Sequence, residues 1–229
     1  MIDTMCGFCS EYFRSDNNSN LFNSMLKNRF KTCSRIIIDS SACYVLPTIG
    51  CFVEGYCLIV SKRHVGSIGR LNDVEQDAFA ALINLLNEYS LETYNKPVIC
   101  FEHGAVSCNN LAGGCVDHAH LHVVPYEQKL CDVVRSYGLT VQRIESIRSL
   151  HSIAFSDRPY LYWKEINGEE YVVVDEFVSS QFFRKIIADS HGLTDKWDWR
   201  EYPFVDNMIS TYRKAKQFFA ECNGKDDEK

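Results

Sequence analysis

Short apolar runs separated by turn residues dominate residues 34–60. The runs SRIIIDS, ACYVLP and EGYCLIV are rich in β-branched and aromatic residues, and turn signals lie at Ser40, at Ser41 and over residues 47–50. Runs of this length bounded by turn residues are typical of strands joined by short connections. The segment therefore predicts an antiparallel meander.

The strongest helical pattern follows this meander. Asn72 can cap the helix, and Glu75 stands three residues later, which is the spacing of a capping box. Apolar residues then recur at helical spacing: Val74, Ala78, Phe79, Leu82, Ile83, Leu86 and Tyr89. We expect a long amphipathic helix that ends before Pro97.

Two more strands are predicted on either side of a connection rich in Gly and Asn. The run KPVICFEHG and the run VDHAHLHVVP both have strand character, and AVSCNNLAGGC joins them. This order places the connection beside the histidines of the second run. A helical stretch over residues 127–137, ended by Gly138, is expected next.

The last third of the chain predicts an extension. YLYWKEINGEEYVVVD contains two β-rich runs joined by Asn167-Gly168, a strong hairpin signal. Ser179 or Ser180 can cap a helix through SQFFRKIIADS, and a last helix can begin at Asp206. The expected fold class is α+β. Residues 1–130 are predicted to form one domain, and residues 131–229 an extension packed on it.

The composition narrows the class of partner. The 229 residues are 46% hydrophobic, enough for a real core, and the net charge is −6. This charge argues against binding to nucleic-acid backbone or to anionic membranes, which needs clustered Lys and Arg. No apolar run approaches membrane-spanning length. The eleven cysteines are odd in number and several lie in apolar runs, so we expect free thiols in a reducing cytoplasm.

The candidate chemistry lies in the run VDHAHLHVVP. In a strand, alternate side chains share one face, so His118, His120 and His122 are expected to line up. Three interpretations arise from the residues alone: a solvated polar face, a metal site built from all three imidazoles, or a nucleophilic site. Neutral imidazole can attack phosphorus at pH 7, and a neighbouring imidazole can hold the phosphate oxygens.

The same residues carry a family resemblance. VDHAHLHVVP fits the signature His-φ-His-φ-His-φ-φ of the histidine-triad (HIT) superfamily, and EGYCLIVSKRH resembles its strand Gly-His-x-Leu-φ-φ-x-Lys-x-His. The resemblance implies an antiparallel sheet of about five strands flanked by helices, frequently in a homodimer. It also implies a nucleotide hydrolase or nucleotidyl transferase that attacks an α-phosphate through a covalent intermediate on His120, with His122 as a phosphate ligand.

The motif CGFC near the start has the spacing of half a tetrahedral zinc site, for which a redox dithiol is the usual rival. In zinc-bearing HIT branches, including galactose-1-phosphate uridylyltransferase-like enzymes, such cysteines join an upstream histidine and the first histidine of the triad. The resemblance therefore implies a structural zinc on Cys6, Cys9, His64 and His118, with two metal-free thiols as the alternative.

Several further residues are candidates for the substrate site. Backbone amides at Gly113, Gly114 and Cys115 can stabilise transition-state charge. His103 can contact phosphate, replace His64 as a zinc ligand or simply be hydrogen-bonded at a strand end. Gln181 and Arg184 near a helix start suit an anion, in a segment that loosely resembles CwfJ-like proteins, or they belong to an ordinary amphipathic helix.

Two departures from the small HIT hydrolases concern the substrate. The chain has Gly114 and Thr48 where those proteins usually carry polar side chains for the phosphate and the ribose. The chemical step is therefore better supported than any particular nucleotide. Two rival functions remain: a nucleotide-sensing or scaffold protein that retains the fold, and a zinc-dependent hydrolase that uses the histidine row as a catalytic metal site.

Overall fold

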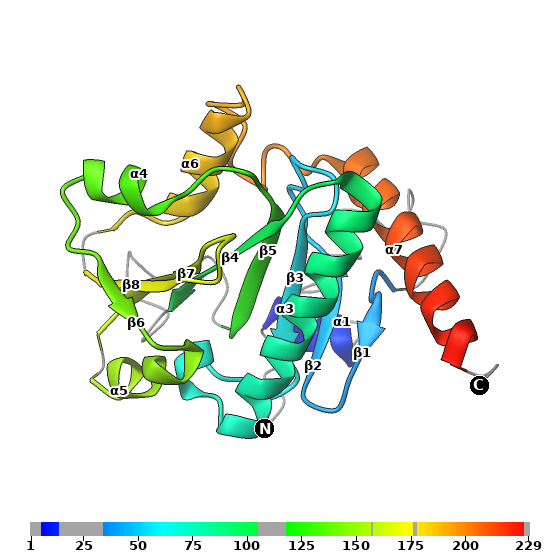
Figure 1. Ribbon diagram of the computed structural model, residues 1–229, viewed down its shortest axis with the longest axis horizontal. Coiled ribbons are helices and arrows are strands. Elements are labelled where there is room, and N and C mark those ends of the chain that lie inside the picture. The colour runs from blue at the N-terminus through cyan, green and yellow to red at the C-terminus, as the bar shows by residue number, and fades with distance from the viewer. Residues whose placement is uncertain (1–5, 14–33, 105–117, 157, 176–177, 227–229) are drawn as a thin grey trace.

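The computed structural model describes residues 6–13, 34–104, 118–156, 158–175 and 178–226 (Figure 1). Its strands are β1 (Ile38–Asp39), β2 (Cys43–Pro47), β3 (Cys57–Ser61), β4 (Val98–Gly104), β5 (His120–Pro125), β6 (Gln142–Ile144), β7 (Tyr160–Lys164) and β8 (Glu170–Val174). Its helices are α1 (Gly7–Tyr12), α3 (Asp73–Tyr94), α4 (Cys131–Ser136), α5 (Leu150–Ala154), α6 (Phe182–Ser190) and α7 (Val205–Asp226), with short 3-10 turns η1 (Ile68–Arg70) and η2 (Ile147–Ser149).

The described strands form one eight-stranded sheet in the order β1-β2-β3-β5-β4-β7-β8-β6. Neighbouring strands are antiparallel, which confirms the α+β class and the meander. The sheet is larger than the expected five-stranded core with a separate hairpin. Strand β7 pairs with β4, with Trp163 opposite Phe101, so the hairpin β7–β8 continues the same sheet.

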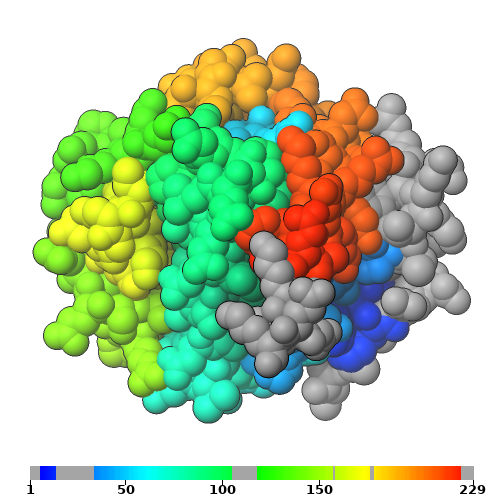
Figure 2. All heavy atoms as spheres, turned by 45° about the vertical axis from the view of Figure 1, so that its right-hand side comes forward, coloured from blue at the N-terminus to red at the C-terminus, as the bar shows by residue number. Residues whose placement is uncertain are grey.

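Helices cover both faces of this sheet, and the alternation of strand side chains decides which residues each face buries. Helices α3 and α5 pack on one face through residues such as Phe79 and Leu150. Helices α1, α4 and α6 pack on the other, and α7 contributes Met208 to that core and Ala215 to the first. The α3 and α7 helices lie side by side on the surface (Figure 2).

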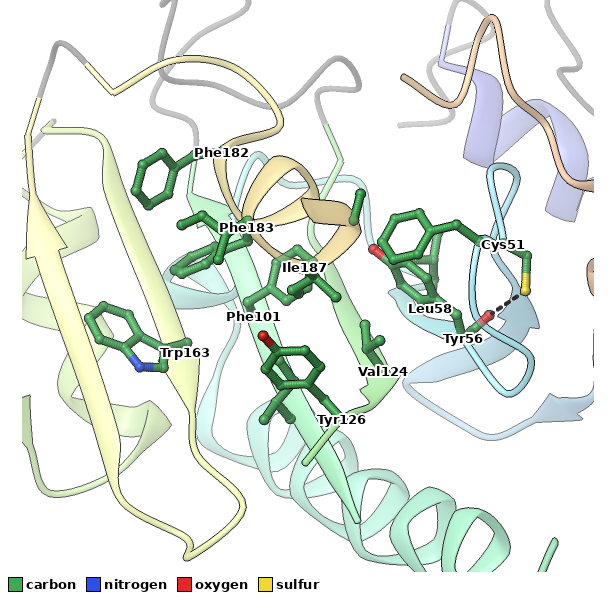
Figure 3. Close-up of a cluster of buried hydrophobic side chains, with 14 of the residues drawn as sticks. Cys51, Tyr56, Leu58, Phe101, Val124, Tyr126, Trp163, Phe182, Phe183 and Ile187 are labelled. Carbon is green, nitrogen blue, oxygen red and sulfur yellow. Dashed lines mark hydrogen bonds between the residues drawn. The ribbon is translucent and has the colours of Figure 1, made fainter. Parts of the chain in front are cut away.

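Helix α6 lies over the middle of the second face (Figure 3). Its Phe183 is fully buried, with its ring centroid 5.0 Å from that of Phe101 in β4 and 5.6 Å from that of Trp163 in β7. One aromatic side chain thus joins a strand of the N-terminal part to a strand of the extension. Packing of this kind fixes α6 over Phe101, whose ring stacks on that of His122.

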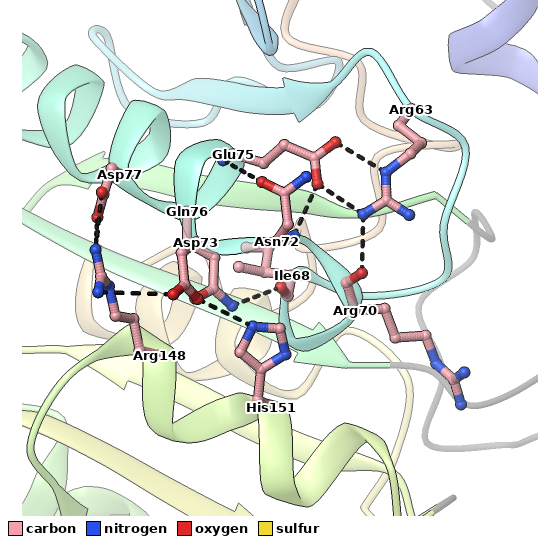
Figure 4. Close-up of polar contacts among 10 residues, drawn as sticks. All are labelled: Arg63, Ile68, Arg70, Asn72, Asp73, Glu75, Gln76, Asp77, Arg148 and His151. Carbon is pink, nitrogen blue, oxygen red and sulfur yellow. Dashed lines mark hydrogen bonds and ion pairs between the residues drawn. The ribbon is translucent and has the colours of Figure 1, made fainter.

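The long helix α3 begins as the sequence predicts. The Asn72 side chain accepts from the Glu75 amide at 2.9 Å, and the Glu75 carboxylate accepts from the Asn72 amide at 2.8 Å, so the capping box is present. Arg63 in turn donates to Glu75, and Arg148 just before α5 donates to Asp77 (Figure 4). These contacts join the start of α3 to the segments on either side of it.

The extension follows the predicted order but differs at one helix start. Gly168 has φ +83, as its turn in the hairpin requires, and the hairpin is confirmed. Helix α6, however, begins at Phe182 with Gln181 as its N-cap, not with Ser179 or Ser180. Gln181 is left-handed, with φ 60, and this sharp reversal turns Phe182 and Phe183 into the core. Burial of two aromatic rings outweighs a hydroxyl cap here.

Candidate active site and metal centre

Four candidate metal ligands come from three separate segments. Cys6 and Cys9 lie at the start of α1, His64 follows β3, and His118 directly precedes β5. The structure brings Cys6, Cys9, His64 and His118 together, with one ligand atom of each within 4.8 Å of all the others. Because β3 and β5 are antiparallel neighbours, the end of one strand and the start of the other meet at the same end of the sheet.

The distances in this cluster match a tetrahedral centre. His118 Nδ1 is 3.4 Å from the Cys6 sulfur and 3.6 Å from the Cys9 sulfur, and His64 Nδ1 is 3.2 Å from His118 Nδ1. Metal bonds of about 2.0–2.1 Å to nitrogen and about 2.3 Å to sulfur, at the tetrahedral angle, place such atoms about 3.3–3.6 Å apart. The four donors therefore fit one metal ion.

The ring of His118 is oriented for this role. Its Nε2–H donates to the Ser61 carbonyl at 2.7 Å, and a carbonyl can only accept. The Nδ1 atom of the neutral ring therefore carries the lone pair that faces the two sulfurs. Fixing one ring nitrogen by a backbone carbonyl so that the other can bind a metal is a common arrangement around metal ions.

The next two histidines face a different space. His120 and His122 lie in β5 on the face covered by α1 and α6, with Phe8 of α1 5.2 Å from the His120 ring. His120 Nδ1–H donates to the His118 carbonyl at 2.6 Å, which leaves Nε2 with its lone pair. Burial lowers the pKa of His120, and its bond to the His118 carbonyl acts in the opposite direction.

His122 is held by contacts of another kind. Its ring stacks on Phe101 with centroids 4.5 Å apart and an interplanar angle of 7°, and its Nδ1 lies 2.6 Å from the Tyr56 hydroxyl. Burial lowers the pKa of His122 well below its ordinary value, and the charge of Arg184 acts in the same direction. The imidazole is therefore neutral at physiological pH.

A pocket opens between these histidines and the C-terminal extension. His120 and His122 line it together with two buried arginines, Arg35 and Arg184, and with Trp199. Phe8, Thr48, Ile49 and Leu58 complete the lining. The pocket thus combines imidazole nitrogens, guanidinium groups and apolar walls, which is a suitable lining for a ligand with one anionic and one apolar part.

The two arginines differ in their partners. Arg35 forms a two-pronged ion pair with Glu11 of α1, at 2.7 and 2.8 Å, with both side chains buried. Arg184 of α6 donates instead to two carbonyls, that of Gly50 at 2.9 Å and that of Trp197 at 3.0 Å. The extension therefore brings a buried positive charge to the pocket, and within the described part of the chain this charge has carbonyl partners and no carboxylate partner.

The other predicted substrate residues have different positions. Gly113, Gly114 and Cys115 lie outside the described residues. Gln181 is buried at the start of α6 but is not among the residues that line the pocket. His103 lies two residues beyond Phe101 on the same face of β4, and burial lowers its pKa to about 3. The metal cluster contains His64 rather than His103.

Some contributors have no distinct signal in the sequence. Tyr56 and Arg35 lie in strand-like, apolar stretches of the sequence, where nothing distinguishes them from other residues of the meander. Glu102 is a third case, because a charged residue in the run KPVICFEHG gives no local sign of burial. It is 2% exposed and accepts from the Ile68 amide at 2.7 Å and from the Tyr160 hydroxyl at 2.6 Å. The burial of all three depends on elements distant in sequence, which local patterns do not reveal.

Comparisons with known proteins agree with the sequence motifs. Residues 29–129 match the family model described as the HIT domain. The sequence has no significant match among the curated proteins. Similar solved structures include a Hit-like protein from Bartonella henselae, involved in cell-cycle regulation and with an unknown ligand. It is 12% identical, covers 58% of this chain and 98% of its own, and has a TM-score of 0.36. Another is a zinc-bound histidine triad family protein from Mycobacterium smegmatis, 17% identical over 53% of this chain and 81% of its own, with a TM-score of 0.34.

Proposed function

This chain contains a HIT domain, and from that premise we propose that it cleaves or transfers a bond at the α-phosphate of a nucleotide through a covalent intermediate on His120. In the first step Nε2 of His120 forms a bond to phosphorus, and the leaving group departs with the electrons of the broken P–O bond. In the second step water or another acceptor attacks phosphorus, the N–P bond breaks and Nε2 regains its lone pair.

The observation that carries this proposal is the orientation of the His120 ring. A carbonyl oxygen accepts the Nδ1 proton of His120, so Nε2 is the unprotonated nitrogen of a ring that lines the pocket. A nucleophilic imidazole needs that tautomer. His122 is close by, with ring centroids 5.0 Å apart, and its Nε2 is free of the contact made by Nδ1. It supplies a ligand for the phosphate oxygens next to the nucleophile.

The remaining substrate contacts belong to the same proposal. Arg184 supplies a positive charge at the pocket, and the amides at Gly113, Gly114 and Cys115 supply the oxyanion donors. Gln181 and His103 are further substrate-side residues in this proposal. Gln181 lies at the start of α6, and His103 lies on the same face of β4 as Phe101.

We further propose that the ion at Cys6, Cys9, His64 and His118 is zinc with a structural role. Two thiols and two imidazoles form a donor set that zinc prefers, and all four tetrahedral positions are filled by protein atoms. Zinc would join α1 to the start of β5. Since His118 Nδ1 faces the sulfurs while His120 Nδ1 faces a carbonyl, the geometry does not favour a single catalytic metal site on the histidine row.

The proposal also covers the binding partner, the cellular location and the oligomeric state of the protein. The partner is a nucleotide or a nucleotide conjugate, and we place the protein in the cytoplasm. None of the described helices has the length and apolar character needed to cross a membrane. A homodimer, which the family resemblance implies, would use a surface other than the edge of β4, because β7 pairs with that edge within the chain.

Replacement of His120 by Ala tests the mechanism. The purified protein is incubated with adenylyl, guanylyl and uridylyl compounds, including sugar nucleotides and dinucleoside polyphosphates, and the intact mass is measured after acid-free quenching. The wild type should gain the mass of one nucleotidyl group, and H120A should lose both the adduct and turnover. The surface variant H151A should keep both. Turnover by H120A, or an adduct on another residue, would contradict the mechanism. A folded wild type that binds nucleotide without an adduct would favour the sensing alternative.

A further inference from the structure

The Tyr56 hydroxyl is the partner that orients His122. Tyr56 directly precedes β3 and is completely buried, and β3 pairs with β5 so that its ring lies beside the His122 ring. The hydroxyl oxygen is 2.6 Å from His122 Nδ1. Burial raises the pKa of Tyr56 to about 12, so the hydroxyl keeps its proton at neutral pH. The distance alone allows either atom to be the donor.

Burial settles the direction of this bond. Among the described residues, His122 Nδ1 is the acceptor within hydrogen-bond distance of the Tyr56 hydroxyl, so the reverse direction would leave the Tyr56 proton buried without an acceptor. Arg184 of helix α6 packs over the Tyr56 ring, with its guanidinium carbon 5.5 Å from the ring centroid. A guanidinium has only donors and cannot take that proton.

Arg184 is itself held in place by the extension and the meander. It is 3% exposed and also donates to the carbonyls of Gly50 and Trp197. Gly50 has φ +76, and a Cβ there would lie 2.6 Å from an Arg184 nitrogen and 2.5 Å from Cβ of Trp199. The site at residue 50 thus admits only glycine if the guanidinium is to stay beside Tyr56.

We infer that Arg184 and Tyr56 form a positioning relay, in which the guanidinium packs on the Tyr56 ring and the Tyr56 hydroxyl donates to Nδ1, that holds neutral His122 in its Nε2–H tautomer. In that tautomer Nε2–H is a donor toward the pocket, where it can stabilise the charge that develops on a phosphoryl oxygen. The inference rests on the proposed function. Tyr56 and Arg184 are positioning residues, and the C-terminal extension thereby takes part in the reaction site of the HIT domain.

The two histidines consequently have opposite tautomers. His120 presents a lone pair because a carbonyl takes its Nδ1 proton, whereas His122 presents an N–H because a hydroxyl donates to its Nδ1. A nucleophile and a hydrogen-bond donor side by side are what an attack on a phosphoryl group requires. If His122 instead carried its proton on Nδ1, its Nε2 lone pair would repel the phosphate oxygen.

The test is the tautomer of His122, measured from long-range ¹H–¹⁵N correlations of the imidazole rings in the full-length protein. The wild type should show a single Nε2–H form for His122. Y56F removes only the hydroxyl and should give a mixture of both tautomers, with a roughly tenfold fall in kcat and little change in KM. R184M should shift the tautomer in the same direction, and R184K, which restores a cationic donor, should recover part of the wild-type signal.

Y89F is the matched control. Tyr89 is an equally buried tyrosine whose hydroxyl bonds to Tyr94 and Thr211 in the opposite core. Its loss should change stability but not the His122 tautomer. An Nδ1–H form in the wild type, or an unchanged tautomer in Y56F, would overturn the relay. The tautomer measurement needs no turnover, so it is independent of the H120A adduct test. The tautomer result can contradict the relay while the adduct still forms. Conversely, the adduct can be absent while His122 has the expected tautomer.

Discussion

Replacement of Glu102 by Gln should change how the stability of the protein depends on pH. Glu102 is 2% exposed in β4, and its carboxylate joins the turn at Ile68 to Tyr160 of β7. Two neutral donors stabilise the ionised form, but burial opposes it more strongly. The net effect raises the pKa of Glu102 from 4.5 to about 8.

The sign of the effect follows from linkage. The native carboxyl keeps its proton to a higher pH than the unfolded one, so stability is lost as pH rises from about 4.5 to about 8 and is constant above that. At 1.36 kcal/mol for each pKa unit, the full difference is about 5 kcal/mol, a large part of the roughly 5–15 kcal/mol of a typical domain.

Urea unfolding of the wild type and of E102Q from pH 5 to pH 9 measures this difference. Gln keeps an acceptor for the Ile68 amide and cannot ionise, so its stability relative to the wild type should rise by about 3 kcal/mol between pH 5 and pH 8. Every other titratable group is the same in the two proteins, so its contribution cancels in the difference. E88Q, a change at an exposed glutamate of α3, should give a flat difference. A flat difference for E102Q as well would refute the reasoning.

Two further predictions concern the N-terminal helix α1. C9S should lower the zinc content of the purified protein, measured by inductively coupled plasma mass spectrometry, because it removes one of four ligands. C43S changes a buried thiol outside the cluster and should leave the zinc content unchanged. Equal zinc in the two variants would count against the site. E11A should destabilise the protein by about 3–5 kcal/mol in urea unfolding, because Arg35 stays buried without its partner, while the double variant E11L/R35M should lie close to the wild type. Equal losses in the single and double variants would show that the unpaired charge is not the cause.

Local signals explain which parts of the fold the sequence predicts well. The capping box at Asn72 and the Asn167-Gly168 turn depend on residues three or fewer apart, and both are present. The pairing of β7 with β4 joins residues about sixty positions apart, and no local pattern distinguishes that partner from another strand. The start of α6 is a related case, since burial of Phe183 decides where the helix begins.

The candidate site divides in the same way. The alternation of His118, His120 and His122 and the spacing of Cys6 and Cys9 are visible along the chain, and the structure gives their distances. The partners that set each ring nitrogen are not visible. The Ser61 carbonyl that holds His118 and the Tyr56 hydroxyl that holds His122 reach these rings only through the folded sheet.

The place of β4 in the sheet has a consequence for how the chain can be made. During synthesis, the part that carries the histidines leaves the ribosome before β7 exists, and until then the seven-residue strand VICFEHG has one row of unpaired amides and carbonyls. Such an apolar, unpaired strand is a template for pairing with another chain. A fragment ending near residue 130 should therefore be prone to aggregate, whereas the finished sheet ends in β1 and β6, strands of only two and three residues.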